Sequence, residues 1–548
     1  MFKDISTKNL DYKMIFVAFV SALMVLSCAP VGTTQAFSQG SYLSDKTMPA
    51  MALVYSRIDY TGTYYIPWTS GDEAFTVTSY IGAMGSGFFV NSRGYLITNG
   101  HVVYSFTSKN YKDDYYTKDL IIQDAVVTML NHYSQTYGYT FSQADVQYTL
   151  DYNRQYGQTS DLFRSVYIIL GDAQGDVIEA KRGISATVVN NDPFLGRDLA
   201  LLKVELTNTP ALLIADSDSV STGDTVYAFG YPGVVTFHPA LSPSTLLSPS
   251  MTSGIVSAKR LTAQDISAIQ HSASVTHGNS GGPLVNEEGK VVGVNNMGSI
   301  NDVGLEVAGF NFAIASNVLK NFLQENGVEN SQGTIDSQYQ RGLAYSYTKM
   351  YASAKSDFDA VSSIFTYHWR AQQLSADCQL SLSRGEKADS VVNLAAAGTS
   401  TVKVNKEAMS VNGSLVHSTS MPVPVNITWP ATQVTLEYTK PGGSTVTHTV
   451  TISSGGVFTD SLTPDVSGQW TVRASWAGNI EHNGATSTPV SFTVTEPTLV
   501  ETMTDTGMIY IIPIVVIVAI VAVVFMMRRG KSQRAGAAAA PSSPATQT

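Results

Sequence analysis

The chain has 548 residues, which is too long for a single hydrophobic core and predicts roughly three or four domains. Its hydrophobic content of 44% excludes a largely disordered protein, and its 28 tyrosines with few charges favour an exported, β-rich one. The formal net charge of -10 disfavours nucleic acid as a partner. Cys28 lies in the leader region and leaves Cys378 as the other cysteine, so we expect neither a disulfide framework nor a metal site. No cofactor is predicted.

The N-terminus is typical of a signal peptide. Three lysines precede the apolar run Met14–Ala29, and small residues follow it. We expect cleavage after Ala36. An uncleaved membrane helix within residues 1–36 is the alternative.

The C-terminal region predicts a membrane anchor. Met508–Met527 contains 20 residues without a charge, enough for a helix to cross the hydrocarbon layer. The basic stretch Arg528–Arg534 follows directly, and such a stretch stays on the cytoplasmic side. We therefore expect a single-pass cell-membrane protein whose residues before the anchor are extracytoplasmic. Residues 528–548 would form a basic, disordered cytoplasmic tail.

The region after the leader changes character twice. Residues 37–80 are rich in Tyr, Thr and Ser, and we assign them to an N-terminal extension. Residues 81–328 contain short apolar strands separated by Gly, Asn and Asp, which predicts antiparallel barrels or sandwiches. Residues 105–165 interrupt this pattern. Because Asp119–Tyr133 has apolar residues at helical spacing, we predict a largely helical insertion there.

Residues 333–395 read as a helical segment. Gly342, Tyr345, Ala354 and Phe358 stand roughly where a tetratricopeptide helix pair places its small and aromatic packing residues. An independent array needs at least about three repeats. A helical hairpin linking two domains is therefore the favoured alternative.

Strands return in residues 398–496. The pattern predicts a hairpin turning at Pro441–Gly443 and a half-buried strand across Trp470–Trp476, where apolar residues alternate. About seven short strands in roughly 100 residues resemble an immunoglobulin-like sandwich. The glycosylation sequons Asn412–Ser414 and Asn426–Thr428 would suit an outward-facing surface.

The sequence GNSGGP surrounds Ser280 with residues that suit a nucleophile. Peptide hydrolysis needs a nucleophile, a base and hydrogen-bond donors for the developing oxyanion. Ser280 is the candidate nucleophile, and Gly278 lacks a side chain that would block its N–H. The N–H groups of Gly278 and Ser280 could thus form an oxyanion hole. By itself a glycine-rich turn with a serine is weak evidence, since most such turns are merely turns.

Two further motifs supply a base and an acid. GYLITNGHVV places His101 at the end of an apolar stretch, and GRDLALLKV places Asp198 just before an apolar strand. Each residue has an ordinary structural explanation when it is taken separately. Together with Ser280 they occur in the order His, Asp, Ser, each with suitable flanking residues, and that order is the one of a chymotrypsin-type triad.

With these motifs in place, residues 81–325 resemble the trypsin-like serine proteases, most closely the HtrA/Deg branch. The resemblance rests on GSGFFVNSRGYLITNGHVV, NNDPFLGRDLALLKV, IADSDSVSTGDTVYAFGYP, MTSGIVSAKR, GNSGGPLVNEEGKVVGVN and GFNFAIASNVL, in this order. It implies a mainly β, chymotrypsin-like domain of two barrels, carrying the helical insertion. The helical segment, the sandwich and the transmembrane helix would follow.

The resemblance also implies residue roles. Ser280 would attack the scissile carbonyl, His101 would take and return the proton, and Asp198 would hold His101 in place. Gly278 and Ser280 would supply the oxyanion donors.

The same resemblance implies a substrate-binding strand and pocket. Asn296, Met297 and Gly298 would pair with the substrate backbone, and Ser274 would lie at the base of the primary pocket. A serine there disfavours a basic P1 side chain and leaves an apolar or small one. His271 and His277 are interpreted as loop histidines without a catalytic role.

The chain departs from the HtrA pattern in three respects. No PDZ domain is recognisable after residue 325, the insertion at 105–165 is unusually long, and a C-terminal anchor is present. These departures put PDZ-type regulation and trimeric assembly in doubt, but they leave the triad motifs unchanged.

We therefore predict a membrane-anchored, extracytoplasmic serine endopeptidase that cleaves unfolded or extended polypeptides. The alternative is a non-enzymatic cell-surface binding protein or adhesin with an inactive protease domain. The helical segment and the sandwich are candidate surfaces for contacts with proteins or surface components. The intact set of three triad residues favours the enzyme.

Overall fold

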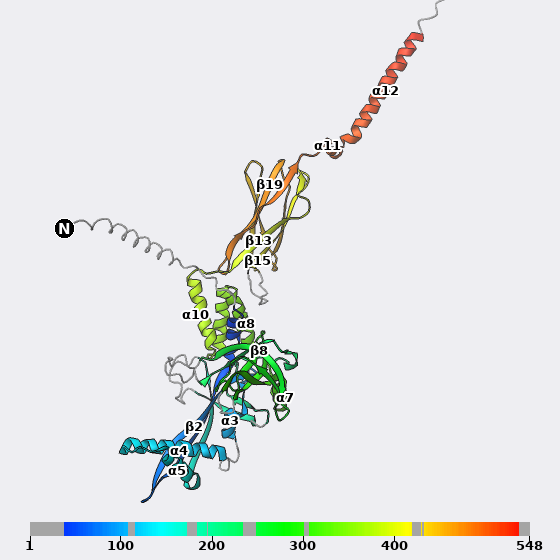
Figure 1. Ribbon diagram of the computed structural model, residues 1–548. Helices are drawn as coiled ribbons and strands as arrows, with labels where there is room; N and C mark the ends of the chain where they lie inside the picture. The colour runs from blue at the N-terminus through cyan, green and yellow to red at the C-terminus, as the bar shows by residue number, and fades with distance from the viewer. Residues whose placement is uncertain are drawn as a thin grey trace, which may run out of the picture. The chain divides into compact units, whose positions relative to one another are not determined.

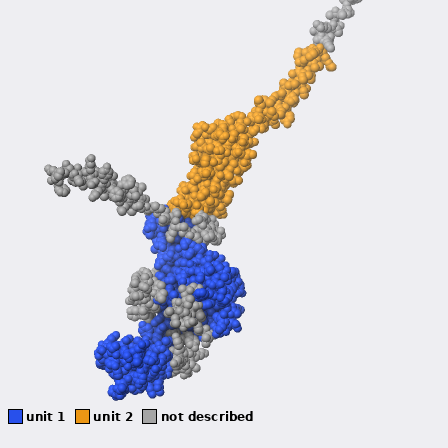
Figure 2. Space-filling view, viewed as in Figure 1, with its two compact units in different colours: residues 1–386, 420–425 blue, residues 387–419, 426–548 orange. Residues whose placement is uncertain are grey.

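The computed structural model describes residues 38–107, 115–171, 183–193, 196–233, 248–300, 306–418, 429 and 432–535. The signal-peptide prediction and the Asn426–Thr428 sequon lie outside these residues. The chain divides into two compact units (Figures 1 and 2). The first contains residues 1–386 and 420–425, and the second contains residues 387–419 and 426–548.

The first unit contains two closed barrels, which agrees with the predicted chymotrypsin-like architecture. The first barrel has the strand order β1-β2-β3-β6-β5-β4. Its strands are β1 (Met51–Trp68), β2 (Gly71–Phe89), β3 (Tyr95–Thr98), β4 (Gln158–Leu170), β5 (Ile184–Asp192) and β6 (Leu199–Val204).

The second barrel has the order β10-β11-β12-β9-β8-β7, and α7 (Ser316–Glu325) follows it. Apolar residues of these strands, such as Val226, Ile269 and Leu284, form a common buried cluster. Its strands are β7 (Thr225–Gly230), β8 (Ser250–Leu261), β9 (Ser267–His271), β10 (Pro283–Val285), β11 (Val291–Ile300) and β12 (Glu306–Ala315).

The start of the first barrel corrects one assignment. We placed residues 37–80 in an extension outside the barrels, which is wrong from Met51 onward. The strand β1 pairs with β2 from Met51↔Phe88 to Trp68↔Gly71 and with β4 on its other side. Before it come the helix α2 (Gln39–Thr47) and a 3-10 turn over Met48–Ala50.

Helices fill most of residues 105–165. The helix α3 (Gly100–Thr107) continues from the end of β3, and α4 (Tyr115–Tyr137) and α5 (Gln143–Tyr156) follow. The last residues of this range already belong to β4. Side chains of α4, such as Ile122 and Met129, share a core with the outer half of the β1–β2 ribbon.

Three helices follow the second barrel: α8 (Thr334–Tyr347), α9 (Tyr351–Ile364) and α10 (Trp369–Ser383). Phe358 is fully buried, and a Cβ on Gly342 would lie 2.8 Å from its ring, so these positions pack as a small and aromatic pair. The helices share one core with the first barrel. They are therefore part of the first unit and do not form a free linker.

The second unit contains a three-stranded sheet (β13-β15-β18) and a six-stranded sheet (β14-β21-β19-β16-β17, with β20 on β19), which share a core. Trp470, Val472, Ala474 and Trp476 are all buried, as the alternation predicts. The predicted hairpin turn lies between β16 and β17, where Thr439 pairs with Thr445. The strands are β13 (Asp389–Ala396), β14 (Thr401–Lys403), β15 (Met409–Ser418), β16 (Gln433–Thr439), β17 (Thr445–Thr451), β18 (Val457–Leu462), β19 (Gly468–Gly478), β20 (Asn483–Thr486) and β21 (Val490–Thr495).

Two helices end the described chain, α11 (Leu499–Asp505) and α12 (Met508–Ala535). Within the described residues, one helical stretch is long and apolar enough to cross a membrane, Met508–Arg529.

Candidate active site

The predicted base and acid lie in contact. Asp198 Oδ2 lies 2.8 Å from His101 Nδ1, and Asp198 Oδ1 accepts a 2.8 Å hydrogen bond from the backbone N–H of His101. The Asp198 side chain is 1% exposed, whereas the His101 side chain is 36% exposed. One buried carboxylate therefore fixes both the backbone and the ring of His101, which leaves Nε2 on the side of the ring away from the acid.

The backbone around Asp198 is unusual. Asp198 has a φ of +52°, in the left-handed region that few non-glycine residues adopt. Asn99 Nδ2 donates to its carbonyl at 2.8 Å and holds this conformation. A Cβ on Gly100 would lie 2.1 Å from the carbonyl oxygen of Asp192, so only glycine fits directly before His101. These contacts hold the acid in one position, as a preorganised site requires.

The Ser280 loop joins β9 to β10 and depends on glycine. Gly278 has a φ of +98° and Gly281 a φ of +88°. A Cβ on Gly278 would lie 2.3 Å from the carbonyl oxygen of Tyr231. The glycines beside Ser280 are therefore required because a side chain at these positions would clash or strain the backbone.

Ser86 is a buried residue of β2 that the sequence analysis missed. Its Oγ donates to the carbonyl of Gly278 at 2.7 Å and accepts from the N–H of Tyr231 at 2.8 Å. Its backbone N–H donates to the carbonyl of Ser280 at 2.8 Å. Ser86 thus fixes the Ser280 loop from the other barrel. A single serine within a strand gives no sequence signal for this role.

The Ser280 loop also packs against the segment that carries the base. A Cβ on Gly281 would lie 2.4 Å from Thr98 Oγ1. A Cβ on Gly85 would lie 2.6 Å from Val102 Cγ2 and 2.9 Å from the carbonyl oxygen of Ser280. The backbone of the nucleophile is therefore close to residues 98–102. The Ser280 hydroxyl itself donates to the carbonyl of Asn296 at 2.9 Å.

The predicted substrate strand lies in β11. Met297 and Gly298 pair with Phe312 and Asn311 of β12. On the other side of β11, β10 pairs only as far as Val294. The backbone of Asn295 also bonds to the Ser280 loop on that side, so among the described residues β11 pairs on one side only from Asn296 onward.

The other predicted pocket residues are less informative. Ser274 is exposed in the loop before Ser280, and its carbonyl accepts from Thr252 Oγ1 at 2.7 Å. Its place at the pocket base stays a prediction. His271, interpreted as a loop residue, instead ends β9 and is fully buried. Burial lowers the pKa of His271 to about 4, and the nearby backbone of Ala273 offsets part of this effect. His277 is exposed in the loop.

Metal-ligating residues are not gathered anywhere in the described part of the chain, which contains no group of three or more His, Cys, Asp or Glu placed to hold an ion. The described residues present a histidine oriented by a buried carboxylate, in a segment packed against the loop that carries Ser280.

Comparisons with known proteins find similarity to serine proteases. Residues 166–294 match the family of the trypsin-like peptidase domain, a range that includes Asp198 and Ser280 but begins after His101. The chain is 32% identical over 144 residues to "Serine protease HTRA2, mitochondrial" of Drosophila willistoni, covering 25% of this chain and 29% of that protein. It is 33% identical over 172 residues to "Serine protease HTRA1A" of Danio rerio, covering 30% of this chain and 32% of that protein.

Among solved structures, "HtrA-type protease AlgW with decapeptide" is similar with 22% sequence identity and a TM-score of 0.31, covering 54% of this chain and 69% of that one. The chain thus spans about a third or less of the length of the two curated relatives named above. The family match and these relatives agree on one point: residues of the barrel region are similar to trypsin-like serine proteases of the HtrA type.

Proposed function

We propose that this protein is a membrane-anchored, extracytoplasmic serine endopeptidase that uses Ser280, His101 and Asp198. The observation that carries the proposal is the double hydrogen bond from His101 to the buried Asp198, in a segment packed against the Ser280 loop. This is how an acid holds a catalytic histidine in one tautomer and orientation.

The mechanism follows from these positions. The Ser280 hydroxyl rotates from the carbonyl of Asn296 toward His101 Nε2, which takes its proton as Oγ attacks the scissile carbonyl. Asp198 stabilises the imidazolium that forms. The N–H groups of Gly278 and Ser280 stabilise the oxyanion. His101 then protonates the leaving amine, and water hydrolyses the acyl-enzyme with His101 as base.

The substrate would be an extended polypeptide. Among the described residues, the part of β11 that contains Asn296, Met297 and Gly298 pairs with β12 on one side, which would leave its other side for a substrate strand. Pairing by strand addition needs an unpaired substrate backbone, which unfolded or extended proteins supply. With Ser274 at its base, the pocket would accept an apolar or small P1 side chain and disfavour a basic one.

The remaining parts would position the protease. Met508–Arg529 is the proposed anchor, preceded by extracytoplasmic residues and followed by a cytoplasmic tail. Residues 1–36 would be the signal peptide. Residues 398–496 would be an immunoglobulin-like sandwich, a proposal supported by two sheets around a core that contains Trp470.

Ser280→Ala tests the catalytic proposal. The variant lacks the nucleophile, so we expect casein hydrolysis to fall at least about 10³-fold. Ser267→Ala is the matched control, because Ser267 is an exposed serine at the start of β9 in the same barrel. Equal hydrolysis by wild type and Ser280→Ala would reject the proposed nucleophile.

A further inference from the structure

The short helix α11 is amphipathic. At about 100° per residue, Glu501 and Asp505 lie on one face, since residues four apart are neighbours on a helix surface. Leu499, Val500 and Met503 lie on the opposite face. Leu499 is 81% exposed and Val500 is 63% exposed, and Met503 is partly exposed, so the described residues of the sandwich leave most of the apolar face uncovered.

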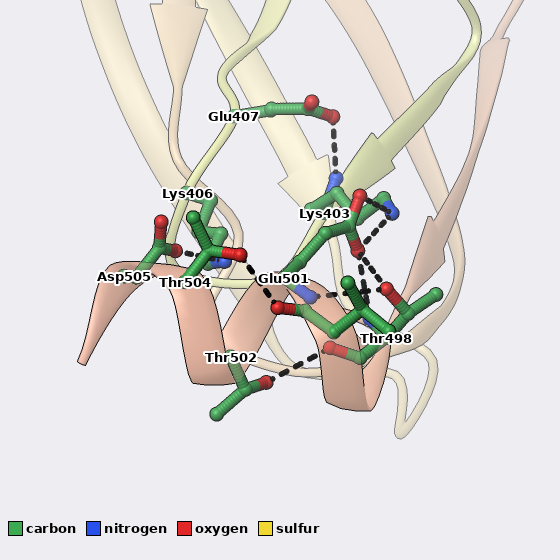
Figure 3. A network of polar contacts seen from close by, with 9 residues as sticks. Lys403, Lys406, Glu407, Thr498, Glu501, Thr502, Thr504 and Asp505 are labelled. Atoms are coloured by element: carbon green, nitrogen blue, oxygen red, sulfur yellow. Dashed lines mark hydrogen bonds and ion pairs between the residues drawn. The ribbon is translucent and has the colours of Figure 1, made fainter. Parts of the chain in front are cut away.

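The acidic face is attached to the sandwich. Lys403 Nζ, at the end of β14, donates to both carboxylate oxygens of Glu501 at 2.6 Å (Figure 3). Lys406 forms an ion pair with Asp505 one turn further along. Thr498 caps the helix, with its N–H donating to Glu501 at 2.7 Å. These contacts set the rotation of α11 about its axis and direct the apolar face away from the sandwich.

A glycine separates α11 from the proposed membrane span. Gly507 has a φ of +69°, which ends α11 and lets α12 begin in a new direction at Met508. Figure 1 draws α11 as a separate short helix between the sandwich and α12. In one continuous upright helix, Val500 would stand about 12 Å above the start of the span, beyond most of the headgroup layer. The break at Gly507 allows α11 to lie along the bilayer surface instead.

We propose that the apolar face of α11 binds the lipid interface of the membrane that α12 crosses, with the Lys403 and Lys406 pairs as the latch that orients it. The proposal rests on the proposed anchoring by Met508–Arg529. Lipid is the occupant because only two residues, Thr506 and Gly507, separate α11 from the apolar span. The ion pairs neutralise the carboxylates of α11, which would otherwise lie unpaired next to the bilayer. The apolar residues on the opposite face of the helix can then insert at the boundary between headgroups and acyl chains. The base of the sandwich is then held against the membrane and does not swing on a free tether.

The test compares two valines of the second unit. Val500→Cys and Val457→Cys, each in a Cys28→Ser full-length chain, are labelled with an environment-sensitive fluorophore and reconstituted in phosphatidylcholine vesicles. Cys378 is 1% exposed and is protected from the label by burial. Val457 is 55% exposed and lies at the start of β18. The other end of β18 leads to Pro464, whose carbonyl accepts from the N–H of Asn405 near the latch. Position 457 is therefore at the end of the strand that is away from the latch.

Nitroxide lipids should quench the label at position 500 at least about twofold more than the label at position 457, with a blue shift at 500 only. Equal quenching at the two positions would overturn the proposal.

Charge reversal tests the latch. Lys403→Glu places like charges at the Lys403–Glu501 contact, so we expect quenching at position 500 to fall toward the value at 457. The exchanged pair Lys403→Glu with Glu501→Lys should restore it. Lys387→Glu is the control, because Lys387 donates to the carbonyl of Asn479 and does not contact α11. Unchanged quenching in Lys403→Glu would reject the latch.

The readout separates this proposal from the proposed function. Quenching does not depend on proteolysis and can be measured in a Ser280→Ala chain. Vesicle-bound protein with no quenching at position 500 rejects lipid binding by α11 and leaves the anchor in place. Protein that fails to float with vesicles rejects both, whereas casein hydrolysis still tests the protease.

Discussion

In the proposed triad, Asp198 would act through its two hydrogen bonds to His101. Asp198→Asn keeps the shape of the side chain, but an amide presents its N–H₂ to the ring and favours the wrong tautomer of His101. We expect casein hydrolysis to fall about 10³- to 10⁴-fold with little change in stability. The measurement is the hydrolysis rate beside the urea midpoint. A variant within tenfold of wild type would remove Asp198 from the triad.

Ser86 is a positioning residue, since it binds the backbone of the Ser280 loop and not the substrate. Ser86→Ala leaves the carbonyl of Gly278 and the N–H of Tyr231 without this partner. We expect a loss of about 1–3 kcal/mol in the free energy of unfolding and a fall in kcat.

Ser316→Ala is the matched control for Ser86→Ala, because the Ser316 hydroxyl is also buried and donates to the carbonyl of Ala215, remote from Gly278. Similar destabilisation of both variants, with kcat reduced only in Ser86→Ala, would support the positioning role. A kcat reduced equally in both would show that Ser86 only stabilises the fold.

At the scale of elements, the helices α8–α10 stabilise the first barrel because they complete its core. Phe358→Ala removes a fully buried ring and should cost about 3–5 kcal/mol. Since the core is shared, the thermal transition of the protease barrel should move down with that of the helices, as measured by hydrolysis after heating. Leu380→Ala, at an exposed site of α10, is the control. An unchanged barrel transition would make the helices an independent domain.

The elements also show what could be predicted from sequence. The strand across Trp470–Trp476 and the turn at Pro441–Gly443 were predictable because alternation and turn residues are local signals. The strand β1 was not predictable, because its Tyr and Thr side chains do not alternate between apolar and polar in the sequence. The alternation is visible only in the burial of these side chains. The union of α8–α10 with the barrel depends on one buried core that contains residues distant in sequence, such as Phe358 and Val54.

At the scale of the whole molecule, the site was more predictable than the arrangement of the domains. His101 and Asp198 were found from their motifs, and the structure brings them together. The family match and relatives show the similarity to HtrA-type serine proteases, whereas the hydrogen bond from Ser280 to Asn296 and the contacts of Ser86 needed coordinates. A hydroxyl can rotate between partners without any change in sequence, so its resting partner has no local signal.

The most direct test of the account is to map the residue that a fluorophosphonate modifies in the full-length protein by mass spectrometry of its peptides. The proposed triad predicts one adduct, on Ser280, and no adduct when His101 is replaced by alanine. An adduct on another serine, or equal labelling of Ser280 in His101→Ala, would contradict the triad.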